Sequence, residues 1–463
     1  MNKFAAMSAA VLFVICTTGC GNTAEQSDDL SAESTSAYVS VVADKTEVQD
    51  KYTTPAETKA ETFITTLETS ADVSIYETLE TEREIQIHFN DETESVSSDN
   101  NYTNNNYTDN QPVEVPHPMP NIYGYTPAFY QLNSDEQTAY DEIVRGMFLL
   151  DDEIEISVQL DESQISKVYS AVLVNMEQQL YAPARKYVLM SYESTGKIHS
   201  VRPEYPYNME ELAFVESEVN SAAEKILSGL TAEMSKVDMI KHLHDSVILS
   251  CKYSADGQNS GNAYGALVEG RAVCEGYARA MAYLCRKAGI NCEIISGTAK
   301  NVSHMWNMVE VDGKWYNIDL TWDDPVLSVD IDDYVSYAYF NVTDSFIKRT
   351  HTPDTSQFSY PVSYAADANY FVYYNKYIST AEQAYDVIYN GIAETLFNGG
   401  DSVFFRFDNQ QVFDDSTALL FDDTWSGFFS IVDEYNQQNE PKIDKNNISV
   451  KKDVENYIIR IAF

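Results

Sequence analysis

Apolar residues recur every three to four positions in several stretches after residue 120, which is the spacing of amphipathic helices. One stretch opens at Ser134–Gln137, where Ser and Gln are spaced as in a capping box, and continues through Met147. Alternation at residues 186–192 and 197–201, on either side of Ser-Thr-Gly, predicts a β-hairpin. The same helical periodicity predicts further helices over residues 161–176, 209–227 and 235–249.

Strand and helix patterns alternate again beyond residue 360. The order predicts a small α/β module without cysteine or histidine, for which a structural role is favoured over partner binding through its aromatic residues. The predicted strands cover residues 370–378, 403–407 and 457–463, and the predicted helices cover residues 380–396 and 426–435.

Between these regions, an alternating segment from His304 to Asp319 is divided by Asp312-Gly313, a strong signal for a two-residue hairpin turn. Such a turn pairs Val311 with Lys314, so that Trp306 faces Asp319 and His304 faces Thr321 one step further on. Side chains at alternate positions share a face, so we expect His304 and Asp319 to be diagonal neighbours about 7–8 Å apart. An imidazole and a carboxylate at that separation are able to hydrogen-bond.

Composition divides the chain before residue 120 from the rest. Residues 21–118 are rich in Thr, Ser, Asp, Glu and Asn, which predicts a disordered, self-repelling acidic tether. The following residues predict an N-terminal α+β support domain at 119–234, a chemical domain at 235–360 and the α/β domain at 361–463. The formal net charge of −42 argues against nucleic acid or anionic lipid as a main partner.

The first 20 residues have the pattern of a targeting segment. Lys3 precedes an apolar run that ends at Cys16, too short to span a membrane as a mature helix. Thr-Thr-Gly before Cys20 resembles a bacterial lipoprotein signal, which predicts lipidation of Cys20 and an extracytoplasmic, membrane-anchored protein. Cleavage without lipid, or a retained anchor, are the alternatives.

Six cysteines occur, and Cys16 and Cys20 belong to the targeting segment. An exported chain is able to pair the others, with at most one intramolecular bridge if Cys274 stays free. Their spacing is not that of a zinc site, so no metal is expected. Cys251, Cys285 and Cys292 remain as possible partners, and the last two are expected to be buried structural residues.

Cys274 has a different setting. Apolar residues follow it at helical spacing up to Gly289, so the thiol is expected at a helix N-terminus. The free N–H groups and the helix dipole there favour thiolate, lowering a pKa that is ordinarily about 8.5. The same N–H groups, including that of Cys274, would hold an oxyanion. A thiol, an imidazole and a carboxylate in this order predict a nucleophile, a base and a residue that orients the base.

The block resembles the transglutaminase-like superfamily of papain-like thiol enzymes. The resemblance rests on Gly-Arg-Ala-Val-Cys-Glu-Gly-Tyr-Ala (270–278), His-Met-Trp-Asn (304–307), Gly-Lys-Trp-Tyr-Asn-Ile-Asp (313–319) and Thr-Trp-Asp-Asp (321–324). It implies an α+β fold with a papain/transglutaminase-like core, in which a helix bearing Cys packs on an antiparallel sheet bearing His and Asp. Carried over, Cys274 is the nucleophile, His304 the general base and acid, and Asp319 the residue that orients His304.

This resemblance implies acyl transfer at a peptide or protein amide, without a cofactor. A hydrolytic peptidase or deamidase, acting on peptides that include cell-wall ones, is the favoured interpretation. True transglutamination and a non-catalytic surface binder are the alternatives. For the second oxyanion donor the candidates are Tyr253 and Tyr264.

Other residues near the block have less specific expectations. The acidic residues at 323–333 are expected to form a solvated loop rather than a calcium site, with Asp323 and Asp324 capping a turn. Arg271 and Arg279 flank the nucleophile, either favouring thiolate or lying on the surface.

Overall fold

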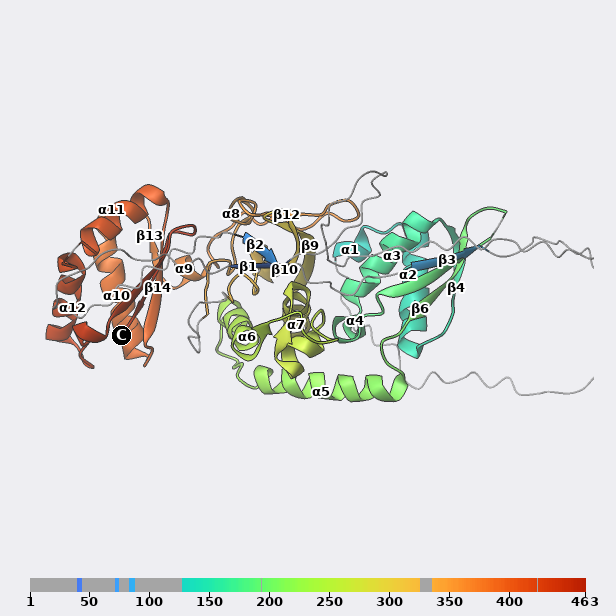
Figure 1. The fold of residues 1–463 in the computed structure, drawn as a ribbon, viewed down its shortest axis with the longest axis horizontal. Helices are drawn as coiled ribbons and strands as arrows, with labels where there is room; N and C mark the ends of the chain where they lie inside the picture. Colours follow the sequence, from blue (N-terminus) through green and yellow to red (C-terminus); the bar gives the residue numbers. More distant parts are fainter. Residues whose placement is uncertain are drawn as a thin grey trace, which may run out of the picture.

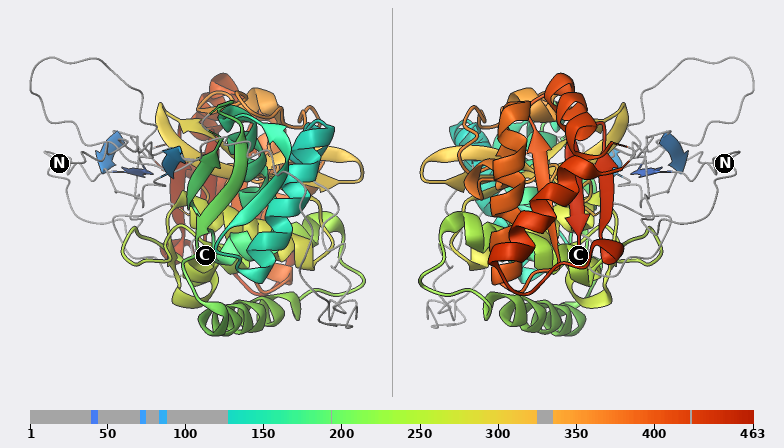
Figure 2. Two further views of the ribbon diagram at one scale, coloured as in Figure 1. Left: turned by 90° about the vertical axis from the view of Figure 1, so that its right-hand side faces the viewer. Right: turned by 90° about the vertical axis from the view of Figure 1, so that its left-hand side faces the viewer.

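The computed structural model describes residues 127–192, 194–324, 335–422 and 424–463, together with three short strands nearer the N-terminus. Three units that each contain a four-stranded sheet lie in a row along the longest axis (Figure 1). The central unit contains Cys274, His304 and Asp319, between the N-terminal and C-terminal units. Figure 2 shows the two ends of this row. No helix of the described residues is long and apolar enough to cross a membrane.

The N-terminal unit packs helices on one sheet, with strand order β3-β5-β6-β4. Its helices and strands are α1 (Pro127–Tyr130), α2 (Ser134–Leu149), β4 (Ile154–Leu160), α3 (Glu162–Asn175), α4 (Glu177–Tyr181), β5 (Lys186–Ser191) and β6 (Ile198–Glu204). The 161–176 helix and the 186–201 hairpin are therefore confirmed to within a few residues. Helix α2 is capped by Asn133 with Glu136, one residue earlier than the predicted box, because the Asn133 side chain accepts from both Asp135 N–H and Glu136 N–H.

Three short strands fall inside the stretch predicted to be a disordered tether: β1 (Ser40–Ala43), β2 (Ala71–Ser74) and β3 (Arg83–Ile87). Strand β3 runs parallel to β5, and β1 pairs with β2. Beyond these three strands nothing tests the tether assigned to residues 21–118, which stays a prediction. Residues 1–20, including Cys20, and the rest of the predicted tether before residue 119 lie outside the described residues.

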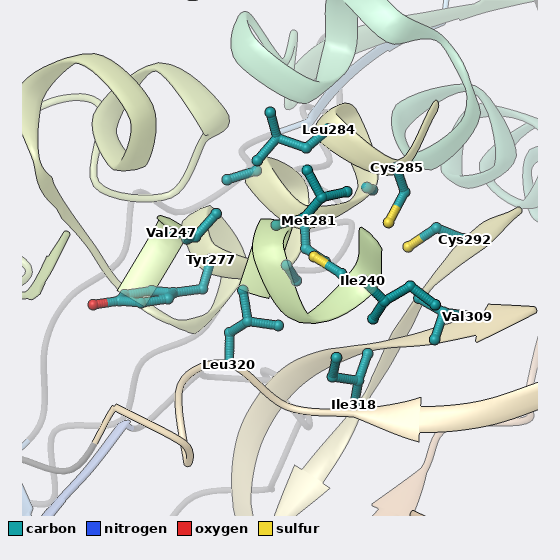
Figure 3. Close-up of a cluster of buried hydrophobic side chains, with 14 of the residues drawn as sticks. Ile240, Val247, Tyr277, Met281, Leu284, Cys285, Cys292, Val309, Ile318 and Leu320 are labelled. Carbon is teal, nitrogen blue, oxygen red and sulfur yellow. The ribbon is translucent and has the colours of Figure 1, made fainter. Parts of the chain in front are cut away.

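The helices α5 (Met209–Leu227), α6 (Lys236–Ser250) and α7 (Cys274–Lys287) confirm the predicted helices. Helix α5 shares its core with α6 and α7, although its residues were assigned to the N-terminal domain at 119–234. Helices α6 and α7 pack together, and α7 covers the sheet. Their apolar faces bury side chains such as Ile240, Met281 and Val309 in one core (Figure 3). Burying a side chain of that size contributes about 1.5–3 kcal/mol, so this core fixes α7 on the sheet. Short elements link α6 to α7: β7 (Lys252–Tyr253), the π-helical turn η1 (Gly265–Glu269) and β8 (Arg271–Ala272).

The central sheet has the order β11-β10-β9-β12, and its strands are antiparallel. Val311 pairs with Lys314 across Asp312-Gly313, as predicted, and both turn residues have positive φ, 51° and 79°. Strand β12 follows the short helix α8 (Asp344–Ile347). The strands are β9 (Cys292–Ala299), β10 (Val302–Val311), β11 (Lys314–Ile318) and β12 (His351–Pro353).

The C-terminal unit has the sheet order β13-β14-β16-β15, with its three longer helices on the side away from the central unit (Figure 1). Its elements are α9 (Tyr370–Tyr373), β13 (Tyr377–Ile378), η2 (Ala381–Gln383), α10 (Ala384–Phe397), β14 (Ser402–Phe407), α11 (Gln410–Leu420), α12 (Ser426–Gln438), η3 (Lys445–Asn447), β15 (Ser449–Asp453) and β16 (Ile458–Ala462).

Two features of this unit differ from the sequence prediction. The predicted strand at 370–378 begins as helix α9, because Asn369 caps it through Phe371 N–H and because Tyr370 and Phe371 pack into the central core. Helix α11 and strand β15 were not predicted, since both have short apolar patterns between polar runs.

Candidate active site

Cys274 is the first residue of α7, as predicted. Val273 precedes it as an N-cap with no side-chain hydrogen bond, so the first backbone N–H groups of the helix are not capped by Val273. Gly276 lets this turn approach the 260–262 segment, since a Cβ there would lie 2.5 Å from the Ser260 carbonyl oxygen. Cys274 is 2% exposed, and its thiol lies in the field of the helix dipole, which favours an anion.

His304 and Asp319 meet as the hairpin register predicts. Nε2 of His304 lies 2.6 Å from Oδ2 of Asp319, and both residues are buried. The imidazole also hydrogen-bonds the Cys274 thiol. Because Nε2 faces Asp319, Nδ1 is the nitrogen directed at the thiol. Burial lowers the pKa of His304, but the Asp319 charge, its hydrogen bond and Cys274 together raise it to about 10.

Asp319 is fixed at both oxygens. Its Oδ1 accepts the backbone N–H groups of Thr321 and Trp322, at 3.0 and 3.2 Å, so the turn after β11 orients the carboxylate. Burial raises the pKa of this group, but the charge of His304 and hydrogen bonds from His304 and His351 hold it well below its usual range. Asp319 is therefore ionised at neutral pH.

His351 is a site residue that the sequence analysis missed. It lies on β12, and its Nε2 donates to the same Asp319 Oδ2 over 3.0 Å, while Nδ1 lies 2.8 Å from the Thr350 hydroxyl. Burial lowers the pKa of His351, and the charge of His304 lowers it further. A neutral imidazole with one donor and one acceptor nitrogen fits these partners.

The signal for His351 was weak, because a His 32 residues after Asp319 has no local pattern. Its position depends on how closely β12 approaches β9. A Cβ at Gly297 would lie 2.2 Å from the Thr352 carbonyl oxygen, so Gly297 is needed for this pairing. That glycine, within Ser-Gly before the His304 motif, is the feature that marks the strand pair.

Aromatic rings surround the two histidines. Trp306 stacks on His304 at 6.2 Å and meets His351 edge-on at 5.1 Å, and Trp322 lies 4.6 Å from His351. Trp315 lies nearby in a small cluster with Trp306 and Ile295. These rings exclude water from the Asp319 carboxylate and strengthen its hydrogen bonds.

Other residues that the sequence analysis singled out lie as follows. Arg279 is 1% exposed rather than on the surface, and it binds Glu275 together with the carbonyl oxygens of Leu173 and Gln179. Arg271 is half exposed. Tyr253 stacks near Tyr277, and Tyr264 precedes η1, so a role for either as oxyanion donor stays a prediction.

Asp323 and Asp324 do not cap a turn at the surface. Asp323 is fully buried and accepts from Tyr339 N–H and from His244, and Asp324 accepts from the Tyr277 hydroxyl. These contacts tie the segment after Asp319 to α6 and α7. Residues 325–334, which contain the rest of the acidic cluster considered for calcium, lie outside the described residues.

Four cysteines lie in the described part of the chain, all buried and none in a disulfide: Cys251, Cys274, Cys285 and Cys292. Burial raises the pKa of Cys251 to about 12 and raises that of Cys292.

His304, Asp319 and His351 have ligand atoms within 4.8 Å of one another, a spacing that permits a metal ion. Each already hydrogen-bonds another member of the group, so they are satisfied without one, and the absence of a metal stays a prediction.

Residues 220–320 match the family model of the Transglutaminase-like superfamily. The central segment belongs to this superfamily. Mouse kyphoscoliosis peptidase is 26% identical over 96 residues, which cover 18% of this chain and 14% of that protein. The human protein of the same name is 33% identical over 61 residues, 11% of this chain and 9% of its own length. The chain thus matches only a small part of these curated relatives.

Among solved structures, one described as a TGase is 14% identical, with a TM-score of 0.22, over 36% of this chain and 50% of that chain. The fold prediction, mixed α and β with antiparallel sheets and a transglutaminase-like core, is confirmed.

Proposed function

We propose that this transglutaminase-like chain is a cysteine enzyme that cleaves peptide or protein amides, as a peptidase or deamidase. One observation carries the proposal: a helix-N-terminal thiol, an imidazole and an ionised carboxylate form one hydrogen-bonded series, Cys274–His304–Asp319. Cys274 is the nucleophile, His304 the base and then acid, and Asp319 the residue that orients His304.

The reaction follows from this arrangement. The Cys274 thiolate attacks the amide carbon, and backbone N–H groups at the start of α7 stabilise the oxyanion. As the C–N bond breaks, His304 gives its Nδ1 proton to the departing amine, leaving a thioester on Cys274. Water then attacks the thioester, His304 takes its proton, and the C–S bond breaks to release the acid and the thiolate.

The test is mass spectrometry of a glutamine-containing peptide library after incubation with the full-length chain. Deamidation adds about one mass unit, peptide cleavage adds a water, and both support hydrolysis. Incorporation of an added primary amine would instead establish transglutamination. No turnover by the unmodified chain, when Cys274 in a separate aliquot of the same preparation reacts fully with iodoacetamide, would establish a binding module. The Cys274→Ser variant is the matched control for each product.

Anchoring to the outer face of a bacterial membrane through lipidated Cys20 is part of the proposal and is supported by the sequence pattern alone. Membrane fractionation of wild-type and Cys20→Ala chains tests it. The variant is expected in the soluble extracytoplasmic fraction. Full retention in the membrane would exclude lipid as the sole anchor.

A further inference from the structure

A cavity of about 460 Å³ lies between the N-terminal and central units. Helices α1 and α3 form one wall, and β9, β12 and residues 357–360 form the other. Its volume is within the range of small-ligand sites. Gly297, the cross-strand partner of His304, and Ser303 line it, so the cavity lies close to the candidate active site without containing Cys274.

Glu293 lines this cavity, and the residue as a whole is 7% exposed. Among the residues that the structure describes, its side chain has no hydrogen-bond or ion-pair partner. Arg286 is the nearby cation, but its guanidinium donates to the carbonyl oxygens of Asn175 and Val174 at 2.6 and 2.7 Å. Arg286 therefore hydrogen-bonds the C-terminal end of α3 and does not pair with Glu293. A buried carboxyl without a partner is costly to ionise, which makes it a group that a ligand would complete.

The rest of the lining favours a positively charged ligand. Ser296, Thr298 and Ser303 carry hydroxyl groups, and Asp354 adds a second carboxylate. No lysine, arginine or histidine lines the cavity in the described part of the chain. Tyr360 contributes a ring, and its hydroxyl hydrogen-bonds the Ser296 backbone. Oxygen acceptors beside an uncompensated carboxyl suit a group that is charged and donates several hydrogen bonds.

We propose that this cavity is a binding site for a ligand with a primary ammonium group, such as a lysine side chain of a peptide, with Glu293 as its counter-ion. The site does not rest on the proposed enzymatic function. It is expected to bind equally well in a Cys274→Ser chain, so that failure of either proposal is seen separately.

Proton release is the distinguishing signature. Burial raises the pKa of Glu293 to about 8, with Arg286 opposing the shift. The other titratable groups near Glu293 are Asp354, Tyr360 and the thiol of Cys292. An ammonium ligand requires the ionised carboxylate, so binding at pH 7 should release about 0.9 proton and should tighten about tenfold by pH 9.

Isothermal titration calorimetry of the full-length chain measures both quantities. The probe is Nα-acetyl-L-lysine methylamide, titrated in phosphate and in HEPES, which carry no primary amine and whose different ionisation enthalpies report the protons released. Nα-acetyl-L-norleucine methylamide, which lacks the ammonium group, is the matched control ligand and is expected not to bind. Glu293→Gln should abolish lysine-probe binding, whereas Glu204→Gln, an exposed residue outside the cavity, should leave it unchanged.

Glu293→Gln resembles the neutral form of the acid, so it is expected to fold, and its melting temperature verifies this. Equal binding by wild type and Glu293→Gln, binding without proton release, or equal affinity for the norleucine probe would each overturn the proposal. So would the absence of lysine-probe binding at both pH 7 and pH 9.

Discussion

His351 donates a hydrogen bond to the carboxylate of Asp319 through the oxygen that also holds His304. The two Nε2–Oδ2 distances are 3.0 and 2.6 Å. Asp319 thus has donors from two imidazoles and two backbone N–H groups, and this fixes the plane in which it presents its charge to His304. We therefore regard His351 as a positioning residue that acts through Asp319.

Replacing His351 by Ala is expected to slow iodoacetamide labelling of Cys274 at pH 7 by about ten- to hundredfold, the value of a hydrogen bond to a charged group. His351→Gln keeps an N–H donor and should recover part of the rate. His242→Ala is the control, since His242 bonds the Ile226 carbonyl oxygen outside the site. Equal rates for wild type and His351→Ala at every pH would assign His351 a purely structural role.

The pH dependence of Cys274 labelling follows from His304. Its raised pKa, about 10, keeps the imidazole cationic through neutral pH and stabilises a thiolate beside it. Labelling of Cys274 should therefore stay nearly constant from pH 8 to pH 6, whereas an ordinary thiol slows about tenfold per pH unit below about 8.5. Peptide mapping after timed labelling gives the rate at each cysteine.

His304→Ala should restore the ordinary pH dependence at Cys274. Cys251 and Cys292 serve as internal references, because burial raises the pKa of both thiols and they should label slowly up to pH 9. A wild-type Cys274 that titrates like a free thiol would contradict the coupling.

The hairpin and the Cys helix could be predicted because their determinants are local. Asp312-Gly313 set the register by turn geometry, and the apolar spacing after Cys274 defined α7. His351 reaches the site only through pairing of β12 with β9, a contact between residues about 50 positions apart. Such pairings depend on the close approach at Gly297, which a single sequence does not specify.

The buried polar contacts between units could not be predicted from the sequence either. Arg279 lies on the predicted helix, but its partners are carbonyl oxygens near the ends of α3 and α4. Sequence periodicity assigns a charged residue to the surface by default, and only the packing of the N-terminal unit against α7 reverses that assignment. Asp323 is likewise a charged residue that is buried in the structure, because it pairs with His244 on α6.

Removing Arg279 is expected to destabilise the chain strongly. Its guanidinium satisfies Glu275 at 2.8 Å and two backbone carbonyl groups at 2.9 Å, all buried. Arg279→Met preserves the length of the side chain but leaves the two carbonyl oxygens without this donor and Glu275 with Arg185 alone, so a loss of about 3–5 kcal/mol in unfolding free energy is expected. Urea denaturation measures it. Lys225→Met is the control, because Lys225 is an exposed residue of α5, and it should change stability by less than about 0.5 kcal/mol. A similar small change for Arg279→Met would show that the contacts do not stabilise the fold.

Chelation is expected to leave Cys274 labelling unchanged, because His304, Asp319 and His351 satisfy one another without a metal. Added Zn²⁺ should slow labelling, since the three ligand atoms lie within 4.8 Å of one another and metal binding would take Nε2 of His304 from Asp319. Timed labelling after EDTA treatment, and again after zinc is restored in excess, gives both rates. Loss of labelling on chelation would establish a resident metal.

The stability of the chain should depend on pH through Glu293. Its pKa rises from 4.5 to about 8 on folding because the carboxyl is buried. Below pH 4.5 the acid is protonated in both states and costs nothing. Between pH 4.5 and 8 the unfolded chain loses the proton first, so folding stability falls as pH rises, by on the order of a few kcal/mol.

Glu293→Gln removes this titration. Near pH 4.5 the variant and wild type should have the same unfolding free energy. As pH rises to 8 the unfolding free energy of the variant should become progressively larger than that of wild type, and above pH 8 the difference should stay constant. Asp323 and Asp324 also have pKa values raised to about 6, but they are common to both chains and cancel in the difference. Urea denaturation at pH 5, 6, 7 and 8 measures the curve. A difference that does not change with pH would mean that Glu293 is ionised in the folded chain, and that a cation already neutralises it.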